Sequence, residues 1–196
     1  MVLYCGTFGL LNKVEYLADV AAEVNTIDPE IRFLAVGSGA GLETVRQRAQ
    51  ERGVLGVNFF ILPPIPKNEI PVVFGASTIS TSLFAPIKEM ESNSANKFFD
   101  SLAAGRPVAI NYGGWQEELL ASSGAGLRLD PFDYHAAARQ LTDFMSNPSR
   151  LADASVAARK LATDKFSRDD IAAQLLELFG KVLPEDARKG KTSRAS

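Results

Sequence analysis

Residues 96–114, NKFFDSLAAGRPVAINYGG, decide the fold of this chain, because a helix and a buried strand follow one another there with only a short turn between them. The pattern predicts a helix over residues 96–104 that Gly105 ends, and Pro107 opens the apolar strand that follows. A helix joined so tightly to an apolar strand is typical of the repeating unit of α/β proteins.

The predicted helix has two different faces. Its apolar side is formed by Phe98, Phe99, Leu102 and Ala103, and its polar side by Asn96, Lys97, Asp100 and Ser101. Residues 93–95 offer capping side chains, and the amides and positive dipole end of a helix start attract phosphate. We therefore expect a phosphate at residues 94–96 and ligand hydroxyls on Asp100, a layout suited to a nucleotide sugar. The alternative is a solvated Asp100 on an ordinary crossover helix.

Short apolar runs alternate with helical patterns along the rest of the chain. Strands are expected at residues 2–6, 31–37, 57–62, 77–83, 107–111 and 126–129. The other helices are expected at residues 13–25, 42–52, 68–74, 116–122, 134–145, 149–163 and 168–183. This alternation predicts an α/β fold, a Rossmann-like doubly wound parallel sheet of about six strands with helices on both faces. We expect one domain over residues 1–183 and a polar, disordered tail over residues 184–196.

Ligands of open α/β sheets bind at the carboxyl ends of the strands, so the loops there are the candidate contacts. In the first loop Gly6 and Gly9 lie on either side of Thr7 and Phe8, so backbone amides can approach a phosphate. A plain structural turn is an equal alternative for this loop.

A second glycine-rich loop, GSGAG at residues 37–41, raises the hypothesis of a dinucleotide site. The next strand ends in ILPP and offers no acidic residue for a ribose, so we interpret Gly37 as part of a second loop at the same cleft. Prolines stiffen residues 63–66 after that strand, where either a base contact or a plain turn fits. Trp115, after two glycines, is interpreted as a wall of the cleft, with a buried anchor as the alternative.

The composition limits the function classes. The chain has 196 residues, 46% of them hydrophobic and 22% charged, with a net charge of −2, which indicates a globular protein and gives no support to a nucleic-acid partner. No apolar run is as long as a membrane span. A single cysteine, Cys5, expected to be a buried thiol, and a single histidine, His135, exclude a Cys/His zinc site within the chain. We expect no metal and no cofactor.

Several segments together resemble the carboxy-terminal, donor-binding domain of GT-B glycosyltransferases of family 4 (group 1). In the helix and the strand that follows it, the similar residues are Asp100, SLAA, Gly105, Arg106, Pro107 and Val108. Further similar segments are VLYCGTFG at residues 2–9, LAVGSGAG at 34–41, ILPPIPKNEIP at 61–71, GGWQEELL at 113–120 and FSRDDIA at 166–172. Asn96, Lys97 and Trp115 make the chain similar to the subgroup that synthesises bacterial surface polysaccharides.

Two positions depart from the family pattern. The paired acids usually lie eight residues apart, but Ser92 stands eight before Asp100, and Glu91 is the substitute one residue earlier. The first loop usually has an arginine and a lysine for the diphosphate, where this chain has Thr7 and Asn12.

The resemblance implies which residues carry the function. Glu91, Lys97 and Asp100 are the catalytic candidates, and Lys13 and Lys97 are the cations that would replace the missing pair. The expected donor-binding residues are Gly6, Thr7, Phe8, Gly9, Asn12, Lys13, Gly37, Pro64, Ile65, Ser94, Ala95, Asn96, Gly114 and Trp115.

The resemblance also implies an activity: a retaining, metal-independent transfer of a sugar, of hexosyl type, from a nucleoside-diphosphate sugar to a glycan or lipid-linked acceptor. The amino-terminal, acceptor-binding domain is expected to be absent, so the chain should bind donor and be inactive alone. A cytoplasmic location is implied, with the full-length enzyme peripheral at the inner membrane.

Three other functions stay open. A non-catalytic GT-B-like interaction module fits the uncharged Thr7, Asn12 and Ser92. A sugar-nucleotide epimerase half would need catalytic acids from this half of the protein. A dinucleotide-dependent oxidoreductase would rest on GSGAG alone. The base, the sugar, the acceptor, the oligomeric state and the role of Glu91 are also open.

Overall fold

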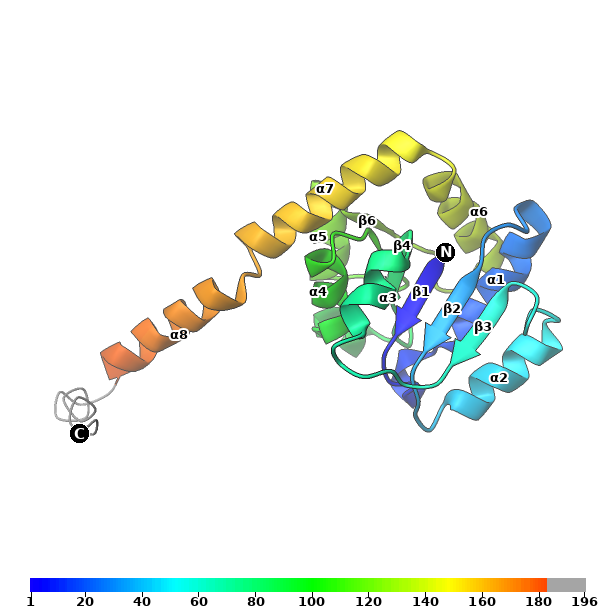
Figure 1. Cartoon of the computed structure of the whole chain (residues 1–196), viewed down its shortest axis with the longest axis horizontal. Coiled ribbons are helices and arrows are strands. Elements are labelled where there is room, and N and C mark those ends of the chain that lie inside the picture. The colour runs from blue at the N-terminus through cyan, green and yellow to red at the C-terminus, as the bar shows by residue number, and fades with distance from the viewer. Residues whose placement is uncertain (183–196) are drawn as a thin grey trace.

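The computed structural model describes residues 1–182, and the predicted tail at residues 184–196 lies outside them. Six parallel strands form one sheet in the order β3-β2-β1-β4-β5-β6 (Figure 1). Their bounds are Val2–Cys5 (β1), Phe33–Val36 (β2), Phe59–Leu62 (β3), Ile79–Ser82 (β4), Val108–Ile110 (β5) and Gly126–Arg128 (β6). The prediction of a doubly wound parallel sheet is confirmed.

Eight α-helices accompany the strands within the described residues. They are α1 (Glu15–Ile27), α2 (Leu42–Glu51), α3 (Ile70–Ala76), α4 (Asn96–Ala103), α5 (Trp115–Ser123), α6 (Tyr134–Met145), α7 (Pro148–Asp164) and α8 (Arg168–Val182). Two short 3-10 helices lie at the carboxyl ends of strands: η1 (Leu10–Asn12) and η2 (Lys88–Ser92).

The helices cover both faces of the sheet. Helices α1, α2 and α6 pack on one face, where Tyr4 and Phe33 point, and α3, α4, α5 and α7 pack on the other, where Leu3 points. Residues alternate in this way because successive side chains of a strand leave opposite faces. Phe98 of α4 is fully buried on the second face, and burial of such a side chain stabilises the fold by about 1.5–3 kcal/mol.

The direction of winding reverses between β1 and β4. The chain moves from β1 outward to β3, and then returns to pair β4 with the other edge of β1. Loops leaving the carboxyl ends of β1 and β4 therefore diverge, and a crevice between such loops is where open α/β sheets bind their ligands. Helix α4 follows β4, and its first turn faces this edge.

Helix α8 differs from the others because none of its residues is buried. Figure 1 shows it projecting away from the sheet after α7. Its exposed apolar residues include Ile171, Leu175, Leu176, Leu178 and Phe179. No helix within residues 1–182 is long and apolar enough to span a membrane.

Candidate functional site

Lys97 links helix α4 to the carboxyl end of β1. Its ammonium lies 5.2 Å from the centre of the Tyr4 ring and 5.8 Å from that of Phe84. A Cβ built on Gly6 would lie 3.1 Å from Lys97 Cε, so the side chain passes directly over the first loop. Within residues 1–182 Lys97 makes no ion pair. Burial lowers its pKa, and the two rings provide a favourable surface for the cation.

Asp100 lies one turn further along α4 on the same side. Its carboxylate is half-buried and has no hydrogen-bond donor among residues 1–182, while its backbone oxygen accepts from Ala104 N at 3.0 Å. Burial raises the pKa of Asp100, and Arg168 at the start of α8 opposes that rise. A carboxylate without a donor can accept hydrogen bonds from ligand hydroxyls.

The amino end of α4 is open toward this edge. The prediction that residues 93–95 cap it with side chains is wrong: the cap position is Ala95, and no side chain bonds to the helix amides. The Asn93 side chain instead accepts from the adjacent Ser94 N at 2.6 Å. The first amides of α4 thus have no side-chain partner, which suits an anionic ligand next to the exposed Ser94 and Asn96.

The first loop, residues 6–9, follows β1 at the same edge of the sheet. Phe8, expected to touch the donor, is fully buried against Tyr4, with 5.7 Å between the ring centres, so its side chain cannot reach a ligand. Thr7 is exposed, and its carbonyl oxygen accepts from Tyr4 Oη at 2.6 Å. Gly9 lies beside Asn12, whose Oδ1 would be 2.6 Å from a Cβ on Gly9.

Gly37 packs directly against the backbone of the first loop. It is buried, its φ is +147°, and a Cβ there would overlap the carbonyl oxygen of Gly6. The two loops are also joined by Phe8 N donating to Ser38 O at 2.9 Å and Gly41 N donating to Phe8 O at 2.7 Å. Close backbone packing therefore accounts for these glycines of GSGAG, and the contact of Gly37 with a donor stays a prediction.

The two lysines expected to supply positive charge differ in their surroundings. Lys13 Nζ lies 3.3 Å from Glu15 Oε1, so its charge is already compensated. Lys97 retains an uncompensated charge within the described residues. The structure therefore favours Lys97 as the cation at the end of β1.

The remaining expected residues lie on other segments of the chain. Trp115 is half-buried among Phe98, Phe99 and Phe166, and its Nε1 donates to Asn93 O at 3.3 Å. Trp115 thus holds the segment before α4 in place. These contacts match the alternative of a buried anchor rather than the wall of a cleft.

Pro64 is exposed after β3, and Ile65 packs against the core formed around Leu3 and Val36. Glu91 is exposed at the end of η2, and Gly114, with φ +88°, packs so closely on its backbone that a Cβ would overlap the Glu91 carbonyl oxygen.

Sequence analysis missed the residues that surround Lys97 and Asp100. Tyr4, Phe84 and Arg168 come from β1, the loop after β4 and α8, so no local spacing connects them. Cys5 is half-buried rather than buried, and burial raises its pKa. The only available indication was that residues 4–6 and 83–84 end neighbouring strands.

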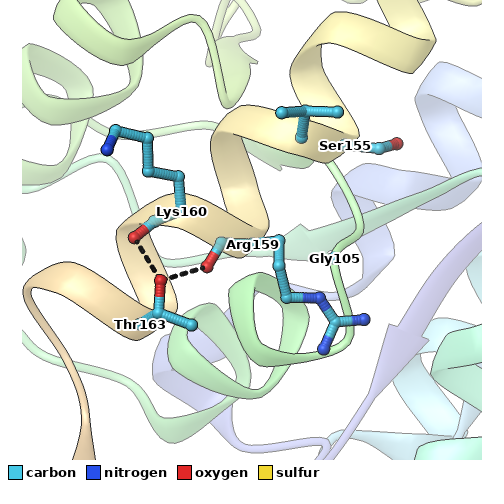
Figure 2. A pocket seen from close by; sticks show the side chains of 6 residues that line it. Gly105, Ser155, Arg159, Lys160 and Thr163 are labelled. Atoms are coloured by element: carbon cyan, nitrogen blue, oxygen red, sulfur yellow. Dashed lines mark hydrogen bonds between the residues drawn. The ribbon is translucent and has the colours of Figure 1, made fainter.

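A separate hollow lies away from Lys97 and Asp100. It measures about 490 Å³ and is lined by α7 and by Gly105, at the carboxyl end of α4. Figure 2 shows Arg159 reaching toward this turn, where its Nη1 donates to Ala103 O at 2.7 Å. This arrangement caps α4. Among residues 1–182, no three His, Cys, Asp or Glu side chains gather as metal ligands.

The family model described as "Glycosyl transferases group 1" matches residues 1–161, most of the chain. The chain belongs to this group 1 family. Comparison of the group 1 domain with curated protein sequences gives no match.

Solved structures share the fold of the group 1 domain. HepE of Anabaena, in complex with UDP-glucose, is 17% identical with a TM-score of 0.76. The match covers 92% of this chain and 48% of the HepE chain. WaaG, a glycosyltransferase involved in lipopolysaccharide biosynthesis, is 17% identical with a TM-score of 0.70. The match covers 89% of this chain and 46% of the WaaG chain. The C-terminal domain of the group 1 protein LpcC from Francisella tularensis is 14% identical with a TM-score of 0.69. The match covers 85% of this chain and 86% of the LpcC domain.

The group 1 domain thus spans about half the length of HepE and WaaG and most of the LpcC domain. At these identities the likeness shows the fold, which is that of GT-B glycosyltransferases.

Proposed function

We propose that this group 1 domain binds the nucleoside-diphosphate part of a sugar donor at the crevice between β1 and β4. The observation that carries the proposal is that Lys97, the uncapped start of α4 and Asp100 meet at this one edge. The ammonium and the helix amides suit a diphosphate, and the carboxylate suits the two hydroxyls of a ribose. HepE, which shares the fold, was solved with UDP-glucose, and this supports the same ligand class.

Within a complete enzyme, the domain would serve a retaining, metal-independent hexosyl transfer. The bond from the sugar carbon to the diphosphate breaks, an acceptor hydroxyl oxygen bonds to that carbon, and its proton passes to the departing diphosphate. Lys97 and the α4 amides would stabilise the negative charge that develops on the diphosphate. Glu91 is the remaining catalytic candidate, as the substitute for the first of the paired acids.

The biological setting is proposed on the resemblance. We infer family 4 membership, a role in surface-polysaccharide synthesis, a separate acceptor-binding domain, and a cytoplasmic enzyme associated peripherally with the inner membrane. WaaG, of the same fold, acts in lipopolysaccharide biosynthesis. For the group 1 domain tested by itself, we expect donor binding and no sugar transfer.

The proposal is tested by calorimetric titration of the chain with UDP, GDP, ADP and NAD, repeated on Asp100→Ala. We expect one nucleoside diphosphate to bind, and the substitution to weaken it about tenfold to a hundredfold, because hydrogen bonds to charged groups contribute about 1.5–3 kcal/mol. Preference for NAD would favour an oxidoreductase. Absence of binding would favour a non-catalytic module, which the uncharged Thr7 and Asn12 also fit.

A further inference from the structure

The segment that leads into α4 is held by the start of α5. Residues 93–95 connect η2 to α4, so the path of this segment sets where the first amides of α4 point. Trp115, the first residue of α5, donates from Nε1 to Asn93 O at 3.3 Å. This oxygen lies two residues before the cap position of α4, Ala95. The indole N–H therefore fastens the approach to the amides that suit a phosphate.

The Trp115 ring is itself fixed by aromatic packing. Its centre lies 5.9 Å from that of Phe98, 6.3 Å from that of Phe99 and 6.4 Å from that of Phe166. Phe98 and Phe99 belong to the first turn of α4, and Phe98 is fully buried. The indole thus joins the body of α4 to the segment that enters the helix.

A second contact with the same segment comes from Gly114, the residue before Trp115. A Cβ on Gly114 would overlap the carbonyl oxygen of Glu91 at the end of η2. Residues 114 and 115 therefore touch the carbonyl groups of residues 91 and 93. The Gly114 contact only limits how closely the backbones approach, whereas the Trp115 contact is directional because a hydrogen bond requires the N–H to point at its acceptor.

The conformation of Asn93 leaves the first amides of α4 to a ligand. Asn93 Oδ1 accepts from Ser94 N at 2.6 Å, and Asn93 Nδ2 lies 3.8 Å from Met90 Sδ. Asparagine is a preferred capping residue, and a capping side chain would occupy the amides that a phosphate needs. With its carbonyl oxygen bonded to Trp115 and its side chain turned onto the next amide, Asn93 makes no bond to the helix.

We propose that Trp115 is a positioning residue for nucleotide binding. It acts through Asn93 O, which holds residues 93–95 in the path that leaves the α4 amides accessible to a diphosphate. This inference rests on the proposed function, because it requires a nucleoside diphosphate at the start of α4. Removal of the indole N–H should therefore weaken binding of a ligand that Trp115 reaches only through the backbone.

The first test is calorimetric titration of the complete chain with UDP, GDP and ADP, on the parent and on Trp115→Phe. Phenylalanine keeps an aromatic ring in the cluster but has no N–H to donate. We expect affinity for the nucleotide that the parent binds to fall about threefold to tenfold, the effect of one hydrogen bond. Phe166→Leu is the matched control, because it removes a ring packed against Trp115 and leaves the bond to Asn93. It should lower the urea midpoint and keep the affinity.

The second test observes the indole in the parent chain and does not depend on the folding of a variant. Trp115 is the single tryptophan, so its indole N–H gives one assignable cross-peak in ¹H–¹⁵N spectra. A ligand on the α4 amides should reduce local opening of residues 93–95. We therefore expect a saturating nucleotide to shift this cross-peak and to slow exchange of the indole proton with solvent. A role in packing alone would leave both unchanged.

Three results would overturn the positioning role while the proposed function stands. They are unchanged nucleotide affinity in Trp115→Phe, an equal loss of affinity in Phe166→Leu, and an indole cross-peak that saturating nucleotide leaves in place. If the parent chain binds none of the three nucleotides, the proposed function fails and the positioning role fails with it.

Discussion

Replacement of Lys97 by methionine should separate ligand binding from folding. Methionine keeps most of the apolar length of the side chain between Tyr4 and Phe84 but removes the charge. The ammonium is largely buried without an anionic partner in residues 1–182, so its removal relieves a desolvation cost. We therefore expect Lys97→Met to lose nucleoside-diphosphate affinity while its free energy of unfolding stays equal or rises.

The size of the binding loss follows from the environment of the ammonium. Two unit charges about 4 Å apart attract by about 4 kcal/mol at an effective dielectric constant of about 20. Desolvation of the phosphate opposes this, and measured hydrogen bonds to charged groups contribute about 1.5–3 kcal/mol. Contact with the two rings is already present in the free protein and does not add to binding. The expected loss is thus about tenfold to a hundredfold in affinity.

The assay is calorimetric titration with UDP, or with the nucleoside diphosphate that the first panel selects, beside urea unfolding of each variant. Lys13→Met is the matched control, because Lys13 is paired with Glu15, and we expect it to change affinity by about twofold or less. The reasoning is refuted if Lys97→Met binds as tightly as the parent chain. It is also refuted if Lys13→Met shows the larger loss.

Three further results are expected. Because burial raises the pKa of Asp100, its ionised form destabilises the fold above that pKa, so Asp100→Asn should raise the melting temperature at neutral pH while weakening nucleotide binding about tenfold. Burial lowers the pKa of Lys97 below its usual 10.5. As the pH increases through that lowered pKa, Lys97 loses its charge, so nucleotide affinity should fall and the free energy of unfolding of the free chain should rise. Calorimetry and urea unfolding should show that both pH effects vanish in Lys97→Met. Gly114→Ala should cost about 2 kcal/mol or more in chemical unfolding, because the new Cβ meets the Glu91 backbone at a positive φ. Gly53→Ala, also at a positive φ but with nothing within 4 Å, should cost only about 1–2 kcal/mol.

Local chemistry explains which elements the sequence predicts well. Helix α6 has the predicted bounds, and Asp133 Oδ1 accepts from Ala136 N at 2.8 Å as its cap. Helix α7 begins one residue before its predicted start, because Asn147 caps it and Pro148 fits its first turn. The strands are shorter than predicted, since apolar residues beyond β2, such as Ile31, are buried without joining its ladder.

The candidate site was harder to predict from the sequence than the helices, because its geometry depends on tertiary contacts. Lys97 and Asp100 could be singled out from one helix, but the rings beside Lys97 come from other segments, Tyr4 from β1 and Phe84 from the loop after β4. The capping prediction failed because the Asn93 side chain bonds to the next amide in the chain instead of to the helix. The pattern GxxG described the backbone of the first loop, but it carried no information on which way Phe8 would turn.

The contact between Gly37 and Gly6 has a consequence for recognising folds from glycine motifs. In this chain the glycine at position 37 is a spacer: it sets how closely two neighbouring loops can stack, and it would be required even if no nucleotide ever bound. A pattern search that treats GSGAG after a strand as a nicotinamide site would therefore misassign this chain, because the glycine at position 37 is required for the packing of two loops. Any side chain at position 37 would push the first loop outward, and the position of Gly6 beneath Lys97 would move with it.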